Sequence, residues 1–290
     1  MGVLLGLLTA LSWGGADFLA RFSTHRVGTL RTMLYMQLTG FLLLTLCLYW
    51  LGGWGHLADG SGWRPWGWGL LAGSINALST LALYRSFEIG KMAVVAPLSA
   101  SYPVLTIFLS LATGEKLSVA RAAGIACTLF GVLVVARGEH VAGESDGESA
   151  TRSTRGIGWA ICAAVGFGFL FWLLGIRIIP TLGAAQTIWM IRLTSTVLTI
   201  AVILLAKQPM GLPRGPARPL ALGTGILDTG AFVVCAYGMR LEQVAIISVL
   251  GSLYGAVTVA LAAIVLREHI SRWQWFGIAT IFAGIYLISR

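Results

Sequence analysis

The residues of this sequence that could do chemistry are charged and polar side chains set inside long apolar stretches. Arg192 lies in the middle of the apolar stretch 184–206, and Asp228 interrupts the stretch 218–237. Because an ionised side chain at the centre of a bilayer costs at least about 2.5 to 3.5 kcal/mol, each needs a partner or a function there. The guanidinium of Arg192 suits a carboxylate or phosphate on a ligand. The alternative is an internal ion pair that holds two helices together.

Three further polar residues extend this set. Asn76 stands 152 residues before Asp228, and Gln37 stands 155 residues before Arg192. Polar groups at matching depths suit a central binding cavity. Because burial disfavours a charged carboxylate, Asp228 could carry a coupling proton, unless Arg192 holds it ionised in a structural pair. Asp17 is the second candidate for proton coupling, although it could equally reach the membrane interface or pair with an arginine one turn later.

Aromatic side chains within the apolar stretches are a softer signal. They could stack on an aromatic ligand or make cation–π contacts with an organic cation, although core packing is the simpler role. The tryptophans near the ends of the stretches instead match an interfacial belt. The candidates for lining a binding pocket are Trp13, Trp172, Trp189, Tyr84, Tyr102, Tyr237 and Tyr254.

Pro97 and Pro103 both fall in the apolar stretch 92–112. Each removes a backbone donor and can kink a helix. A kinked helix with free carbonyls beside a cavity suits a gate, whereas many membrane helices simply tolerate proline. We interpret the two prolines as a candidate gate.

The sequence carries no pattern for a metal, a cofactor or a catalytic centre. Its four histidines lie in the polar connections, and its four cysteines are widely spaced within apolar stretches. The net charge of +9 comes from Lys and Arg scattered singly, without a basic run that would indicate nucleic acid. We therefore expect neither an enzyme nor a nucleic-acid-binding protein.

Composition indicates the elements that must position these residues. Of the 290 residues, 57% are hydrophobic and 11% are charged, against roughly 25% charged in a soluble domain. The length allows about ten spans of about 20 residues. The sequence predicts an all-α integral membrane protein with transmembrane helices at 3–20, 32–51, 66–84, 92–112, 119–136, 157–176, 184–206, 218–237, 244–266 and 273–289.

The chain also repeats itself across one long polar segment, residues 138–155. The pattern predicts a five-helix repeat at 1–137, a linker at 138–155 and a second five-helix repeat at 156–290. An odd number of spans per repeat inserts the second copy in the opposite sense, which gives two inverted repeats. Four residues of the first repeat return 153 residues later: Glu115, Ser118, Gly124 and Gly131 correspond to Glu268, Ser271, Gly277 and Gly284.

With these residues laid out, the chain resembles the EamA-type branch of the drug/metabolite transporter superfamily. The resemblance rests on the following positions: Trp13-Gly14, Ala93 to Pro97, Tyr102-Pro103, Gly114-Glu115, Gly124, Gly131-Val132, Tyr254, Glu268, Ser271, Gly277 and Gly284. It implies an alternating-access carrier that exports an amino acid or related metabolite across a bacterial-type inner membrane. A lipid scramblase or a non-transporting receptor is the alternative.

The sequence also leads to expectations about the partners of the protein and its orientation in the membrane. The expected partners are a small-molecule substrate and the lipid bilayer, and the chain is a monomer or a homodimer. Most Lys and Arg lie in the connections opposite the termini, so the positive-inside rule predicts both termini outside the cytoplasm. The family resemblance implies the opposite orientation.

Overall fold

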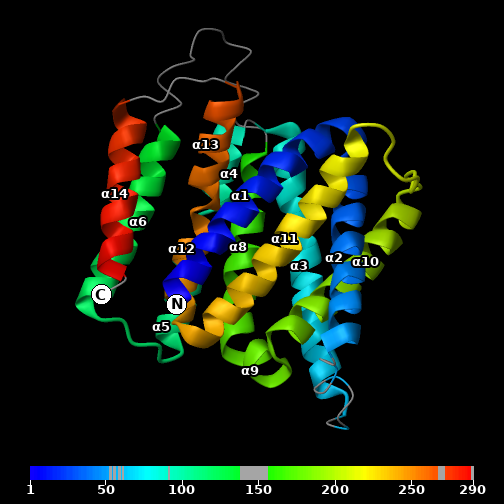
Figure 1. Ribbon diagram of the computed structural model, residues 1–290, viewed down its shortest axis with the longest axis horizontal. Coiled ribbons are helices and arrows are strands. Elements are labelled where there is room, and N and C mark those ends of the chain that lie inside the picture. Colours follow the sequence, from blue (N-terminus) through cyan, green and yellow to red (C-terminus); the bar gives the residue numbers. More distant parts are fainter. Residues whose placement is uncertain are drawn as a thin grey trace.

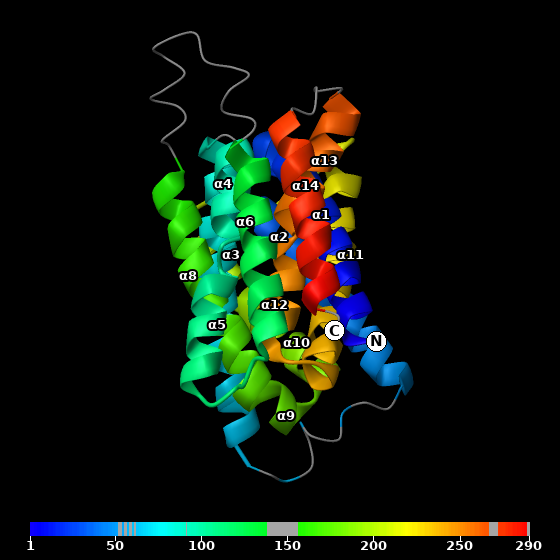
Figure 2. The same cartoon turned by 90° about the vertical axis from the view of Figure 1, so that its left-hand side faces the viewer.

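The protein is a bundle of helices that run between two ends of the molecule. The computed structural model describes residues 1–51, 54, 57, 60, 62–90, 92–137, 156–266 and 272–288, and every regular element within these ranges is helical. Both termini lie at the same end of the bundle (Figures 1 and 2). The predicted linker 138–155 lies outside the described residues.

The helices follow the predicted apolar stretches closely, with breaks in the fourth and ninth. The first half of the chain forms α1 (Gly2–Val27), α2 (Thr29–Leu51), α3 (Arg64–Ile89), α4 (Met92–Ser99), α5 (Pro103–Ala112) and α6 (Val119–Arg137). The second half forms α8 (Ile157–Leu173), the π-helix η2 (Leu174–Ile178), α9 (Ile179–Leu182), α10 (Ala184–Leu205), α11 (Ala217–Leu241), α12 (Val244–Ser252), α13 (Tyr254–Leu266) and α14 (Arg272–Ile288).

Five segments are long and apolar enough to cross a membrane. They are α1, the first 22 residues of α2, the continuous run from α8 to α9, α10 and α11. Large apolar side chains also cover the outer surface: Leu78 is 69% exposed and Phe282 is 68% exposed. An apolar exterior of this kind suits lipid rather than water. The other helices are shorter or more polar, so the count of ten spans stays a prediction.

Two of the expected helices are broken near their middles. The stretch 92–112 stops at Ser99 and restarts at Pro103, which occupies the first turn of α5, where a missing N–H costs nothing. The stretch 244–266 breaks at Leu253, between α12 and α13, without a proline. Proline is therefore not required for the break, and each break brings a tyrosine, Tyr102 or Tyr254, to its edge. Pro97 lies in α4, and its side chain is outside the described part.

Helices of each half of the chain pack against helices of the other half. The helix α1 packs against α11, α12 and α13, while α8 packs against α3, α4 and α5. The pairs α2 with α10 and α6 with α14 complete the pattern.

Glycine allows a close approach between α6 and α14. A Cβ on Gly124 would lie 2.8 Å from the carbonyl oxygen of Gly284, and one on Gly131 would lie 2.8 Å from that of Gly277. The glycines that repeat in the sequence are thus the points where the two helix backbones meet.

Candidate functional site

Arg192 is the centre of a buried polar cluster. Its side chain is 0% exposed in α10, and its Nη2 lies 2.5 Å from Oδ2 of Asp228 in α11. Its Nη1 donates to Oε1 of Gln37 in α2 at 2.7 Å. The guanidinium carbon lies 5.0 Å from the ring centroid of Phe232, a cation–π distance. Arg192 and Asp228 therefore form the internal ion pair that the sequence left open as an alternative.

Glycine makes room for this cluster. A Cβ on Gly40 in α2 would lie 2.1 Å from Oγ1 of Thr229 and 3.1 Å from Nε of Arg192. The missing side chain lets α2 approach α10 and α11 at the depth of the arginine. Three buried polar atoms here have no hydrogen-bond partner among the described residues: Nε of Arg192, Nε2 of Gln37 and Oγ1 of Thr229. The cluster therefore keeps spare hydrogen-bonding capacity.

A cavity lies beside the cluster and reaches both halves of the chain. Its volume is about 30 Å³, room for only about two or three water molecules at about 10 to 15 Å³ each. A metabolite could enter only if the surrounding helices moved apart. The lining residues are Trp13, Asp17, Thr80, Leu83, Tyr84, Tyr102, Phe167, Phe171, Asp228, Phe232 and Tyr254.

Aromatic rings form most of the cavity wall. The ring of Trp13 lies 5.4 Å from that of Phe171 and 5.1 Å from that of Phe232, centroid to centroid. The ring of Tyr102 lies 4.9 Å from that of Phe171. Edge-to-face and tilted pairs of this kind hold one another in place, so the wall is a fixed aromatic surface.

Hydrogen bonds anchor the two tyrosines at the helix breaks. The hydroxyl of Tyr102 donates to the carbonyl oxygen of Ser248 at 3.0 Å, and the hydroxyl of Tyr254 lies 3.0 Å from Oγ of Ser99. Each bond joins one half of the chain to the other. The tyrosine rings are consequently presented to the cavity while their hydroxyls are engaged elsewhere.

Two carboxylates line the cavity, and they differ in their partners. Asp228 is held by Arg192. Asp17 in α1 is 6% exposed, and no hydrogen bond or ion pair of its side chain is found within the described ranges. Since α1 packs against α11, the unpaired carboxylate belongs to the same compact region as the paired one. Asp17 therefore differs from Asp228 in having no partner among the described residues.

Six of the cavity residues are among the candidates predicted from the sequence, whereas none of its phenylalanines is. Trp13, Asp17, Tyr84, Tyr102, Asp228 and Tyr254 line it as candidates, and Gln37 and Arg192 reach it through Asp228. The repeat itself held the missing signal. Offsets of 152 to 154 residues relate cavity residues in pairs: Trp13 to Phe167, Asp17 to Phe171, Thr80 to Phe232, and Tyr102 to Tyr254.

The remaining candidates lie away from the cavity. Asn76 is buried against α10, where its Nδ2 donates to Oγ of Ser195 at 3.1 Å. Trp189 packs on Phe41 and Trp54, and Trp172 donates to Oγ1 of Thr113 near the end of α5. Tyr237 is 44% exposed. Only some of the residues predicted from the sequence therefore line the cavity.

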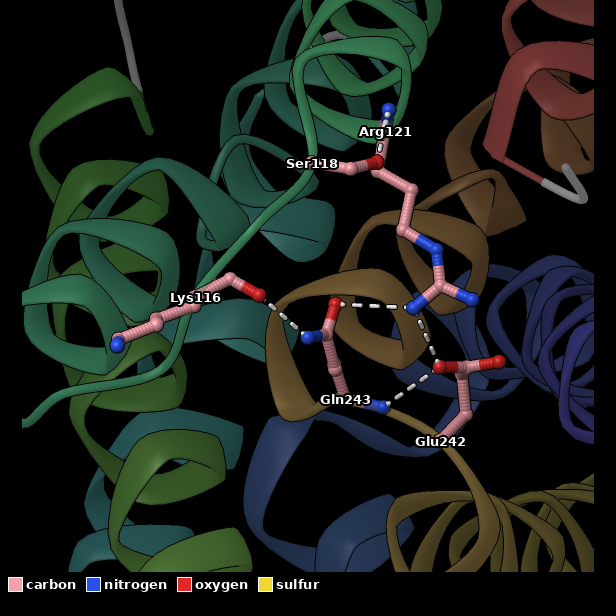
Figure 3. Close-up of polar contacts among 5 residues, drawn as sticks. All are labelled: Lys116, Ser118, Arg121, Glu242 and Gln243. Atoms are coloured by element: carbon pink, nitrogen blue, oxygen red, sulfur yellow. Dashed lines mark hydrogen bonds and ion pairs between the residues drawn. The ribbon is translucent and has the colours of Figure 1, made fainter.

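A second polar cluster joins the two halves near the end that holds the termini, shown in Figure 3. Nη1 of Arg121 in α6 lies 3.0 Å from Oε1 of Glu242 and donates to Oε1 of Gln243 at 3.2 Å. Nε2 of Gln243 donates to the carbonyl oxygen of Lys116 at 2.6 Å. We name these four residues the terminus-end cluster. It fastens the start of α6 to the connection between α11 and α12.

Comparisons with known proteins agree with this architecture. A solved structure described as "Crystal structure of protein" superimposes with a TM-score of 0.77 at 19% sequence identity, covering 99% of this chain and 95% of that one. That likeness shows the fold alone. No curated protein matches significantly. The model of the EamA-like transporter family matches residues 1–137 and again residues 154–290. The match extends over nearly the whole chain, which is therefore a membrane protein that belongs to the EamA-like transporter family.

Proposed function

We propose that this protein is an alternating-access carrier that exports a small metabolite bearing an amino group, such as an amino acid, in exchange for protons across the cell's inner membrane. The observation that carries the proposal is Asp17, a buried carboxylate without a partner among the described residues, in an aromatic cavity that reaches both halves. A lone buried carboxylate is costly unless it is protonated or meets a cation. A proton and a substrate ammonium would therefore compete for it, and competition at one site is the basis of exchange.

The aromatic wall supports a cationic group in the same place. Ring faces attract an ammonium that has lost its water, by about 2 kcal/mol or more when the site is desolvated. Trp13, Phe171 and Phe232 pack around one another beside the two carboxylates. In this proposal Arg192 acts on the substrate indirectly, because it holds Asp228 in the cavity wall.

Alternating access is supported by how the halves are related. The same family model matches residues 1–137 and 154–290, and α1 and α8 run in opposite directions along the bundle (Figure 1). We take these units as the two inverted five-helix repeats of a ten-span carrier, joined by the linker 138–155. The small cavity then corresponds to a closed state, and the terminus-end cluster is one of its closures.

Transport in proteoliposomes tests this function. Vesicles containing the protein are loaded with labelled amino acids or amines, and efflux is measured with and without a more acidic exterior. The acidic exterior should accelerate saturable efflux, because protons entering on Asp17 replace the departing substrate. Asp17→Asn should lower proton-driven efflux about tenfold or more, since a charge-assisted contact is lost. Glu115→Gln, which removes a carboxylate outside the cavity, should leave efflux unchanged.

Three results would overturn the proposal. The proton-exchange mechanism would be wrong if the rate of efflux changed neither with the pH gradient nor with the substitution Asp17→Asn. Movement of labelled lipid between leaflets without any solute exchange would favour the scramblase alternative, and ligand binding without either movement would favour a receptor.

A further inference from the structure

A separate groove runs down the outside of α3 from the end opposite the termini. Its upper part is a cavity of about 470 Å³ at the helix ends, lined by Arg31, Arg85, Glu88 and Trp159 among others. Its lower part is a cavity of about 300 Å³ between α2, α3 and α10. Leu30, Leu81 and Val202 line both cavities, so the two are direct neighbours along α3.

The upper part carries the chemistry of an anion site. Nη2 of Arg31 donates to the carbonyl oxygen of Gly211 at 2.6 Å, while its Nε is buried without a hydrogen-bond partner among the described residues. Arg85 is 45% exposed at its side chain and pairs with Glu88 at 2.8 Å. Two arginines against one glutamate leave the described lining with a net positive charge. Guanidinium groups that line a cavity with a net positive charge favour an anionic oxygen there.

The lower part offers an apolar surface. Oγ of Ser74 donates to the carbonyl oxygen of Leu70, and Oγ1 of Thr199 donates to that of Ser195. Both hydroxyls are satisfied within their own helices, so the lining presents chiefly hydrocarbon. Along α3, Ser74 lies about 16 Å from Arg85 at about 1.5 Å per residue. A ligand that fills the groove therefore has a charged head and a long apolar tail.

The groove is open to the surroundings of the protein. Leu78, in its lower part, is 69% exposed, and Trp159, beside its upper part, is 45% exposed. Tryptophan at a helix end is typical of the lipid headgroup level. Access from the side, through an apolar exterior, suits a molecule that arrives within the bilayer rather than from water.

We propose that this groove binds one anionic phospholipid, with its phosphate on Arg31 and Arg85 and one acyl chain between α2, α3 and α10. The site differs from the central cavity and does not depend on the proposed transport. Because α2 and α3 belong to the first half and α10 to the second, the lipid contacts both halves at once. Described arginines at this end, among them Arg26, Arg31, Arg85 and Arg218, would attract anionic lipid headgroups.

Lipid retention by the full-length protein tests the site. The purified protein is titrated in detergent with phosphatidylglycerol, phosphatidylcholine or inorganic phosphate, and bound molecules are counted by native mass spectrometry. Phosphatidylglycerol should bind about tenfold more tightly than phosphatidylcholine, and inorganic phosphate should not be retained. Arg31→Gln and Arg85→Gln should each weaken phosphatidylglycerol about tenfold, whereas Arg218→Gln, at the same end but outside the groove, should not.

The apolar part of the groove is tested by two substitutions of Ser74. Ser74→Leu fills the groove and should displace the lipid, while Ser74→Ala loses the same hydroxyl without filling it and should keep it. If Arg31→Gln fails to fold, the exposed Arg85 still supplies the charge test. Retention of inorganic phosphate with no effect of Ser74→Leu would replace the lipid by a soluble anion. Equal binding of both lipids in the parent and the arginine variants would overturn the site altogether.

Discussion

Two ion pairs that join neighbouring segments of the chain differ in burial. The side chains of Arg192 and Asp228 are 0% and 13% exposed, and they are surrounded by Gln37 and Phe232. The side chains of Arg121 and Glu242 are 27% and 20% exposed, at an end of the bundle. Removing one partner of a buried pair strands a charge and costs about 3 to 5 kcal/mol. The partly exposed pair should contribute less, because surface pairs contribute only about 0.2 to 1 kcal/mol.

The difference in burial indicates different roles: the buried pair stabilises the fold, and the partly exposed pair can break when the halves move. The pair of Arg192 with Asp228 lies within the second half, between α10 and α11, so it can persist while the halves move. The pair of Arg121 with Glu242 joins the two halves, so any opening at that end must break it. A weak contact suits this place, because its loss costs little.

Replacing Arg192 should produce the largest effect. Arg192→Met keeps much of the volume but leaves Asp228 buried without its cation, so we expect a loss of about 3 to 5 kcal/mol in the free energy of unfolding. The measurement is denaturant unfolding of the purified protein in detergent. The double variant Arg192→Met with Asp228→Leu should recover part of that loss, since no charge is left unpaired. A double variant no better than the single one would mean that the pair is not the source of the effect.

Crowding the cluster without touching its charges should cost less. Gly40→Ala places a Cβ 2.1 Å from Oγ1 of Thr229, and overpacking of this kind costs about 1 to 3 kcal/mol. The matched control is Gly230→Ala, also in a helix, where a Cβ would meet nothing within 4 Å. That substitution should be neutral or slightly stabilising. Equal melting temperatures for the two variants would show that α2 can retreat from Arg192 at no cost.

Much of this architecture could be predicted from the sequence, because its signals are local. Apolar stretches mark the helices, and the EamA-like family predicted from the repeated motifs is confirmed. The polar residues inside those stretches led to Arg192, which contacts both Asp228 and Gln37. A charge in an apolar helix has few ways to be satisfied, so its presence in the sequence already limits its surroundings.

The faces of the helices could not be predicted in the same way. A membrane helix is apolar on all sides, so no periodic stripe tells which side meets the cavity and which meets lipid. Trp189 and Phe171 look equivalent in the sequence, yet Trp189 packs beside Trp54 and Phe171 lines the cavity. The break at Leu253 has no proline to announce it. The contact of Arg121 with Glu242 depends on how distant segments meet, which no local pattern encodes.

The smallest effect on stability should come from the terminus-end cluster, where the effect on transport should be distinct. Arg121→Gln removes the charge that joins α6 to Glu242, so we expect a loss of at most about 1 kcal/mol in the free energy of unfolding. Because the closure at that end is weakened, the rate of solute exchange in proteoliposomes should change at least severalfold. Arg64→Gln removes an exposed arginine at the same end, outside the cluster, and should change neither quantity.

Salt provides a second test of the same contact. The screening length falls from about 8 Å at physiological ionic strength to about 3 Å at 1 M salt, so a partly exposed pair is weakened by added salt, whereas a buried pair is screened far less. Raising the salt concentration should therefore shift the exchange rate of the parent toward that of Arg121→Gln and leave the variant itself nearly unchanged. If salt changed the exchange rates of both proteins alike, the pair of Arg121 with Glu242 would not control the opening. The two ion pairs would then differ only in how much they contribute to stability.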